Sequence, residues 1–234
     1  MLELKKKFEQ FDDKWRKHLS NTFSNRNKQS AERHAFWIDH EFLRVLYHND
    51  FEIAPNVFRA NQPSEKRIYE WKKTKGIKSI INFRGISDQG AFLLEKNACE
   101  KAGINLINLK LYSSKLPEKE KIFTLKEIFQ TIEPPFLMHC KSGSDRAGLG
   151  SALYFLLVLN SSISEAQKQL SFRYLHLGGW TAGILDFMLM QYRIANEEKG
   201  IEFLDWIERD YDIKNLTLMY KNFRKNSAFF KIPR

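Results

Sequence analysis

The stretch PFLMHCKSGSDRAGLGSALYFLLVL, residues 135–159, decides the fold class of this chain. Its first five residues form an apolar run, which we interpret as a buried strand over 135–139. A short polar loop follows, and an apolar helix is predicted from about 144 to 159. A strand that leads through a tight loop into a helix is the repeating unit of an α/β domain with a parallel sheet.

More strand–helix units precede this stretch, and they extend the same pattern. Ser64 is expected to cap one of the helices, and Gly76 and Gly103 are expected to end two of them. The sequence therefore predicts an α/β domain with a central, mainly parallel sheet of about four to five strands flanked by helices. Strands are expected at 57–62, 77–83 and 104–111, helices at 35–51, 64–75, 89–102 and 118–132, and a helical layer from 164 onward.

Length and charge divide the chain into three parts. Its 234 residues, of which 43% are hydrophobic, suffice for one substantial domain, which we place at 37–213. The net charge of +10 comes from the two ends: a basic amphipathic extension at 1–36 and a basic, aromatic tail at 214–234. Basic ends on a neutral body indicate attraction to an anionic surface. A membrane surface is favoured over nucleic acid, because no nucleic-acid-binding motif is present.

The cysteine content and the hydropathy pattern limit where in the cell the protein can be expected. Two cysteines without regular spacing exclude a disulfide framework or a zinc cage. The N-terminal residues are charged and lack the apolar core of a secretory signal. No uncharged run reaches the roughly 20 residues of a transmembrane helix. We therefore expect a cytoplasmic protein, with peripheral attachment to the inner membrane face as an option.

The loop after the strand at 135–139 combines a thiol with an anion site. Cys140 opens the loop, and the following helix offers unpaired N–H groups and a partial positive charge that favour both a thiolate and a bound anion. Gly143 allows the backbone to curl its N–H groups inward, and Arg146 supplies a planar fork of donors that suits two phosphate oxygens. The arrangement suits attack of a thiolate on phosphorus. The alternative is that Cys140 is a small buried side chain at the end of a strand.

The stretch HCKSGSDRAG resembles the H-C-x5-R-x-G signature of cysteine-based protein tyrosine and dual-specificity phosphatases. VFRANQPS and GIKSIINFRG resemble the early strands of compact bacterial members, and LSFRYLHLGGWTAGILDFM resembles the helical continuation of an alphaproteobacterial branch. The resemblance covers about residues 37–210 and implies a tyrosine-phosphatase-like fold.

The resemblance also implies roles for individual residues. Cys140 would form a phosphocysteine, Arg146 would hold the phosphate oxygens, and His139 would position the cysteine. No metal and no cofactor are needed, because the arginine and the backbone stabilise the charge. The remaining phosphate-binding positions are Lys141, Ser142, Gly143, Ser144 and Ala147, and Arg84 and Lys115 are expected in supporting places near the loop.

Two departures from the family pattern leave the proton donor open. Members usually carry a general-acid aspartate about 30 residues before the cysteine, whereas no aspartate occurs here between Asp88 and Asp145. Asp145 is the first candidate for the acid, with orientation of Arg146 as its alternative role, and Glu118 is the second candidate. Ala147 stands where many members have a hydroxyl. A pseudophosphatase that binds phosphorylated ligands without turnover is therefore the main alternative, and a rhodanese-like sulfur transferase is a weaker one.

Charges around the loop bear on the substrate. Lys141 and Lys115, together with the missing acidic residue, favour a phospholipid or polyol phosphate, whereas the family as a whole favours a phosphoprotein. Arg59 is expected to brace the loop. Asp186 is expected to bond within the helical layer, and His176, in aromatic surroundings, is interpreted as a structural group.

Overall fold

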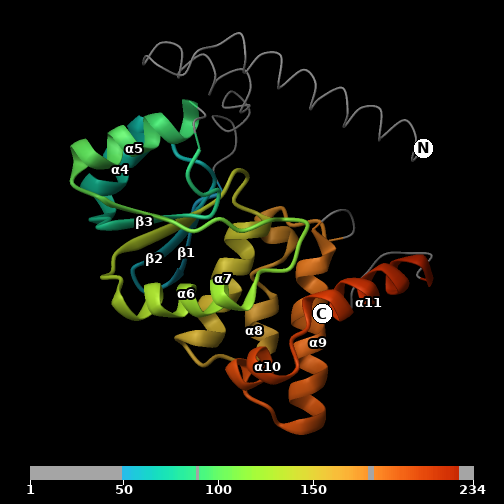
Figure 1. Ribbon diagram of the computed structural model, residues 1–234. Helices are drawn as coiled ribbons and strands as arrows, with labels where there is room; N and C mark the ends of the chain where they lie inside the picture. Colours follow the sequence, from blue (N-terminus) through green and yellow to red (C-terminus); the bar gives the residue numbers. More distant parts are fainter. Residues whose placement is uncertain (1–48, 88–89, 179–181, 227–234) are drawn as a thin grey trace, which may run out of the picture.

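A computed structural model of the chain describes residues 49–87, 90–178 and 182–226 (Figure 1). Labels follow that figure. The elements are, in chain order, β1 (Phe51–Ala54), β2 (Val57–Ala60), α4 (Glu65–Lys75), β3 (Ser79–Asn82), α5 (Gly90–Ala102), β4 (Asn105–Asn108), α6 (Lys119–Thr131), β5 (Phe136–His139), α7 (Asp145–Leu157), α8 (Ile163–Gln167), the 3-10 turn η1 (Phe172–Tyr174), α9 (Gly183–Lys199), α10 (Phe203–Arg209) and α11 (Ile213–Asn226).

The sheet has five strands in the order β1-β2-β5-β3-β4. β5 lies at the centre and pairs in parallel with both β2 and β3, and β3 pairs in parallel with β4. Only β1 is antiparallel, and it pairs with β2 at the edge. The mainly parallel sheet predicted from the sequence is thus confirmed, and its central strand is the one that leads into Cys140.

Alternating residues of the strands serve two separate hydrophobic clusters. Leu137 of β5 and Ile80 of β3 face a cluster that includes Ile68 and Trp71 of α4. Their neighbours, such as Met138, face the other cluster, which is built with α6, α7 and α9. Figure 1 shows α4 and α5 on one side of the sheet and α6 and α7 on the other. Both faces are covered, as burial of a parallel sheet requires.

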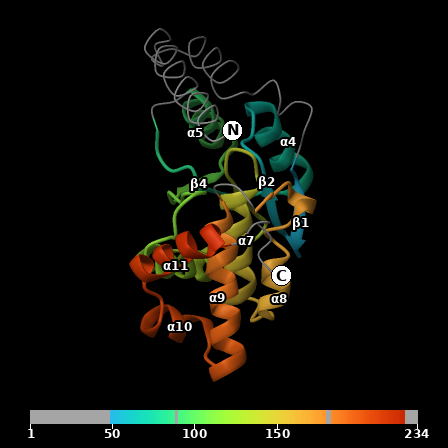
Figure 2. The same cartoon turned by 90° about the vertical axis from the view of Figure 1, so that its right-hand side faces the viewer.

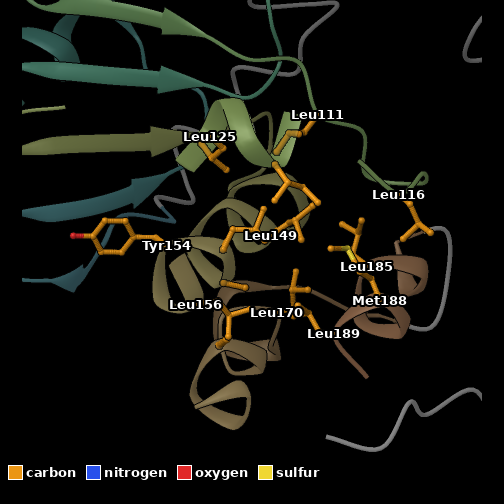
Figure 3. Close-up of a cluster of buried hydrophobic side chains, with 14 of the residues drawn as sticks. Leu111, Leu116, Leu125, Leu149, Tyr154, Leu156, Leu170, Leu185, Met188 and Leu189 are labelled. Carbon is orange, nitrogen blue, oxygen red and sulfur yellow. The ribbon is translucent and has the colours of Figure 1, made fainter. Parts of the chain in front are cut away.

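A helical layer that includes α9 and α11 packs on the side of α7 away from the sheet, and in Figure 2 it faces the viewer. Leu149 and Leu156 of α7 meet Leu185 and Leu189 of α9 in one buried cluster, and Figure 3 shows these side chains converging. α7 is therefore apolar around most of its circumference, because it packs against the sheet on one side and α9 on the other. This agrees with the helical layer expected from residue 164 onward.

Cap residues predicted from the sequence occupy their expected places. The Ser64 side chain accepts from the N–H of Arg67 at the start of α4, and Gly76 ends that helix at φ +64°. Gly103, at φ +61°, follows α5. Element ends are less accurate: the strand expected at 104–111 ends at Asn108, because Leu109 and Leu111 bond to Asn82 and Phe83 outside the regular ladder.

One expected element is wrong at its end. The helix predicted over 35–51 cannot reach Phe51, which begins strand β1 and pairs with Arg59. Tertiary pairing with β2 overrides the aromatic helical pattern there. The rest of that helix and the basic extension at 1–36 lie outside the described residues.

The segment expected to be a tail starts at the second residue of α11. Leu216 and Tyr220 of this helix are buried, and the Tyr220 ring lies 5.5 Å from that of Phe187 on α9. The first part of the segment is therefore packed against the domain. In the part of the chain that the structure describes, no helix has the length and apolar character needed to cross a membrane.

Candidate active site

The loop that follows β5 lies at the carboxyl edge of the sheet, where open α/β sheets place their ligands. Cys140 is 1% exposed at the base of this loop, directly after the central strand. α7 begins five residues later, at Asp145. The predicted sequence of strand, loop and apolar helix is therefore present, and it places the thiol beside a helix N-terminus.

All four peptide carbonyls from Lys141 to Ser144 accept hydrogen bonds from outside the loop. The Gln62 N–H donates to Lys141 O at 3.2 Å, and the Asn49 amide donates to Ser142 O at 3.2 Å. The Arg59 guanidinium donates to Gly143 O at 2.7 Å and to Ser144 O at 3.1 Å. In a planar trans peptide the N–H of the next residue points away from such a carbonyl. The N–H groups of residues 142–145 are thereby directed to the inner side of the loop, as an anion cradle needs.

Arg59 is the principal brace of the loop. Its side chain is fully buried, and besides the two loop carbonyls it donates to Gln169 O at 2.8 Å. The guanidinium also lies 3.9 Å from the centre of the Tyr174 ring. A planar group with five donors can join three backbone carbonyls at once, which a lysine ammonium cannot do in the same geometry.

Gly143 is required by its conformation and by its surroundings. Its φ is +77°, and a Cβ at this position would lie 2.8 Å from Asn61 N and 2.9 Å from Ala60 O. The loop thus passes against the backbone that follows β2, at a place where no side chain fits.

A buried chain of polar groups supports the loop from below. His139 Nε2 lies 2.6 Å from Glu95 Oε1, and both side chains are fully buried. Gln62 donates to the other Glu95 oxygen at 2.8 Å, and Arg84 donates to Gln62 Oε1 at 2.7 Å. Arg84 is thus linked to this chain of polar groups through Gln62.

Comparison with known proteins identifies the family. A model described as "DSP-PTPase phosphatase fused to NAD+ Kinase" matches residues 47–176, which is more than half of the chain and includes the whole loop. The chain belongs to this family.

Three further matches show which known proteins and structures are similar to this chain. The dual specificity protein phosphatase TpbA of Pseudomonas aeruginosa is 24% identical over 111 residues, 47% of each chain, so the match spans about half the length of this curated relative. The crystal structure of a mutant form of Tk-PTP matches 64% of this chain and 97% of its own, with a TM-score of 0.50 and 17% identity. A crystal structure of TpbA in complex with phosphotyrosine matches 74% of this chain and 91% of its own, with a TM-score of 0.47 and 19% identity.

In this member of the DSP-PTPase family, Asp145 is held by a buried histidine. Asp145 Oδ1 lies 2.8 Å from His176 Nδ1, and His176 Nε2 lies 2.6 Å from Asp186 Oδ2. Burial by itself lowers the pKa of His176, but the two carboxylates outweigh it and raise that pKa to about 9. His176 was interpreted from the sequence as a structural group, and Asp186 as a partner within the helical layer; their link to Asp145 was not expected.

The other predicted positions are distributed around the loop. Arg146 is half-buried in the first turn of α7, Lys141 is half-buried, and Ala147 is buried. The hydroxyls of Ser142 and Ser144 share a hydrogen bond of 2.6 Å.

The segment that follows β4, which the sequence comparison with the family predicted as the place of the usual acid, is fixed at both ends. The Leu111 N–H bonds to Phe83 O, and the Tyr211 hydroxyl donates to Pro117 O at 2.7 Å. Between these anchors, Lys115 is exposed, with Nζ 5.3 Å from the centre of the Tyr112 ring. Glu118, the second candidate for the acid, is exposed and pairs with Lys121 at 2.7 Å.

Sequence reasoning missed Asn49, Gln62 and Glu95. Glu95 had a detectable signal, since it lies on the apolar face of α5 among Ala91, Phe92, Ala98 and Cys99. A carboxylate on a buried face needs a partner. Asn49 and Gln62 lie in irregular segments and carried no comparable signal.

Proposed function

We propose that this protein is a cysteine-dependent phosphomonoester phosphatase that works through a phosphocysteine on Cys140. The observation that carries the proposal is the loop whose four carbonyls are bonded outward, so that its N–H groups face inward above the thiol. Membership of the DSP-PTPase family supports the same chemistry.

The proposed reaction has two steps. The Cys140 thiolate attacks phosphorus, and the bond from phosphorus to the leaving oxygen breaks while Asp145 gives that oxygen a proton. Water then attacks the phosphocysteine, gives a proton to Asp145 and releases phosphate and the thiolate. Arg146 and the N–H groups of residues 141–147 hold the equatorial oxygens through both steps.

Hydrolysis of p-nitrophenyl phosphate tests the activity. We expect Cys140→Ser to abolish turnover and to retain binding of inorganic phosphate or vanadate, because the loop backbone is unchanged. Cys99→Ser is the matched control, since Cys99 is buried among α4, α5 and the opposite face of the sheet. Equal activity of Cys140→Ser and the wild type would refute the proposal.

Pre-steady-state kinetics separate the enzyme from the alternative of a pseudophosphatase. An enzyme continues to release phosphate after the first turnover, and acid quenching during turnover should trap a phosphorylated Cys140. Release of one equivalent of phosphate without a steady state, or no release of phosphate at all, would support a binding module. The absence of a hydroxyl at Ala147 would then be one reason for the lack of turnover.

For the substrate we propose an anionic phosphate ester, either a phosphoprotein or a phospholipid or polyol phosphate. Lys110, Lys115 and Lys121 all lie within 5.6 Å of the centre of the exposed Tyr112 ring, which concentrates positive charge on the segment after β4. A panel of phosphotyrosine peptide, phosphoinositide and sugar phosphate, each assayed with and without anionic vesicles, distinguishes the classes. Stimulation by vesicles that disappears at high salt would support peripheral membrane attachment.

A further inference from the structure

His176 uses both ring nitrogens on carboxylates from two different helices. Nδ1 faces Asp145 on α7 at 2.8 Å, and Nε2 faces Asp186 on α9 at 2.6 Å. The imidazole is fully buried and the Asp186 side chain is 7% exposed, whereas Asp145 is 27% exposed. The cluster therefore has one end that solvent or a substrate can reach, and that end is next to Arg146.

Two short contacts on one imidazole set the smallest number of protons that the cluster holds. A neutral imidazole has one donor and one acceptor, so it cannot donate to two ionised carboxylates at once. Both contacts become hydrogen bonds only when the three groups together hold at least two protons. One lies between Nε2 and Asp186, and the other is shared between Nδ1 and Asp145. If the buried cluster held only one proton, the Nδ1 lone pair would face a carboxylate oxygen, and these two acceptors would repel each other.

We propose that His176 is a positioning residue that stores the acid proton of Asp145, and that Asp186 holds His176 in the orientation and charge state that this requires. The inference rests on the proposed function. It explains how a chain without the family's usual upstream aspartate can keep a proton donor at neutral pH. Asp186 lies outside the residues matched by the family model, 47–176.

The proton balance fits both steps of the proposed reaction. In the first step the leaving oxygen takes the shared proton from Asp145, which leaves Asp145 ionised and His176 neutral, with its remaining N–H on Asp186. Two acceptors then face each other across 2.8 Å, so the pair has a high affinity for a proton. In the second step the attacking water supplies that proton as its oxygen bonds to phosphorus, and the resting state returns without any other reactant.

Charged and titratable groups approach the cluster from several elements. Asp145 comes from α7 and Asp186 from α9. Burial raises the pKa of Tyr220 on α11, and the Asp186 carboxylate adds to that rise while Arg224 opposes it. Arg59 of β2 and Arg173 of η1 both lie over the Tyr174 ring, two residues before His176. Arg146 adjoins Asp145 in the chain. Burial of the imidazole opposes protonation of His176, and the two carboxylates in direct contact outweigh it and raise its pKa.

The test compares an alkyl phosphate with p-nitrophenyl phosphate over pH 5–10. Only the alkyl leaving group needs a proton, so the ratio of the two rates isolates the acid. His176→Asn places an amide donor near the position of Nδ1 but cannot store a proton. We expect it to lower the ratio at pH 8 at least about tenfold, within the range of general acid catalysis. The alkaline limb of the alkyl-phosphate profile should move to lower pH by about two units or more.

Asp186→Asn is the second variant, and it leaves both Asp145 and His176 in place. We expect it to move the same limb to lower pH by about one unit, because the imidazolium loses one carboxylate. Asp205→Asn is the matched control: it makes the same change on an exposed residue of α10 and should leave both profiles unchanged. If both variants lost the same fraction of their hydrolysis rate on the two substrates and the alkaline limb of the pH profile did not move, His176 would have only a structural role.

Nitrogen NMR of the full chain gives a readout that is independent of activity. We expect His176 to carry protons on both ring nitrogens at pH 7.5 and to lose one only near pH 9. A neutral ring at pH 7.5 would overturn the inference even if the enzyme is active. Absence of p-nitrophenyl phosphate hydrolysis by the wild type would instead refute the proposed function, so the two failures are distinguishable.

Discussion

Glu95 Oε1 lies 2.6 Å from His139 Nε2, and neither side chain has any exposed surface. This contact joins α5, on one face of the sheet, to the residue before Cys140. His139 Nδ1 in turn lies 3.3 Å from Cys140 O. The orientation of the loop that begins at Cys140 therefore depends on a carboxylate 45 positions away in sequence, and the stability of the fold and the geometry of the loop are coupled.

Glu95→Ala should be strongly destabilising. Removal of one partner of a buried polar pair typically costs about 3–5 kcal/mol, because the other partner stays buried without it. Urea denaturation of the full chain measures the loss. Glu100→Ala, on an exposed residue of the same helix, should change the free energy of unfolding by less than about 0.5 kcal/mol. Similar values for both variants would contradict the coupling described above.

Gly143→Ala should disrupt the loop more than its φ alone explains. The new Cβ would meet the backbone of Asn61 and Ala60 at 2.8–2.9 Å, so the loop must move and vanadate affinity should fall at least about tenfold. Gly200→Ala is the control for strain without a clash: its φ is +62°, and nothing lies within 4 Å of the new Cβ. That variant should lose only about 1 kcal/mol of stability and no affinity. Unchanged vanadate binding by Gly143→Ala would show that the close approach is not needed.

Arg59→Lys should separate the role of the charge from that of the planar fork. Lysine keeps the positive charge but cannot reach Gly143 O, Ser144 O and Gln169 O together, so about 2–5 kcal/mol of stability should be lost along with vanadate affinity. Arg193→Lys, at a partly exposed site on α9, provides the matched control and should be nearly neutral. A mild effect at both positions would mean that charge alone braces the loop.

Stability should fall between about pH 6.5 and pH 9. The folded state raises the pKa of His176 to about 9 from an ordinary 6.5, so it binds more protons than the unfolded state within this window. Unfolding free energy therefore decreases as pH rises there, and the contribution of His176 amounts to a few kcal/mol. Urea denaturation at several pH values, compared with His176→Asn, isolates this residue. A wild-type slope equal to that of the variant would contradict the prediction.

Much of the architecture could be predicted because its signals are local. The β5–α7 unit shows as an apolar run, a loop and a second apolar run, and Ser64 and Gly76 mark the ends of α4 by the geometry of their own backbone. β1 was missed because Phe51 follows an aromatic, helix-like stretch and becomes a strand only through pairing with β2. Strand pairing is a property of two segments, and one segment alone does not show it.

For the candidate site, too, the sequence predicted the contiguous residues of the loop and did not predict their distant partners. Cys140, Gly143 and Arg146 are adjacent in the chain, so one motif places them together. Asp145 could be chosen as an acid candidate only by elimination. Its partner His176 is 31 residues away and Asp186 another ten, and neither spacing is periodic in a helix or strand.

The sequence by itself thus determined a parallel α/β sheet and a loop of thiol, glycine and arginine, because alternation, caps and a contiguous motif act over short distances. Only the tertiary structure decided what surrounds that loop. Arg59 from β2, Glu95 from α5 and His176 before α9 converge on it because the sheet brings the ends of its strands to one edge and the helices close over both faces. A buried polar group needs a hydrogen-bond partner, and the tertiary structure decides which group is near enough to be that partner. For the buried His176 ring, one such partner is Asp145.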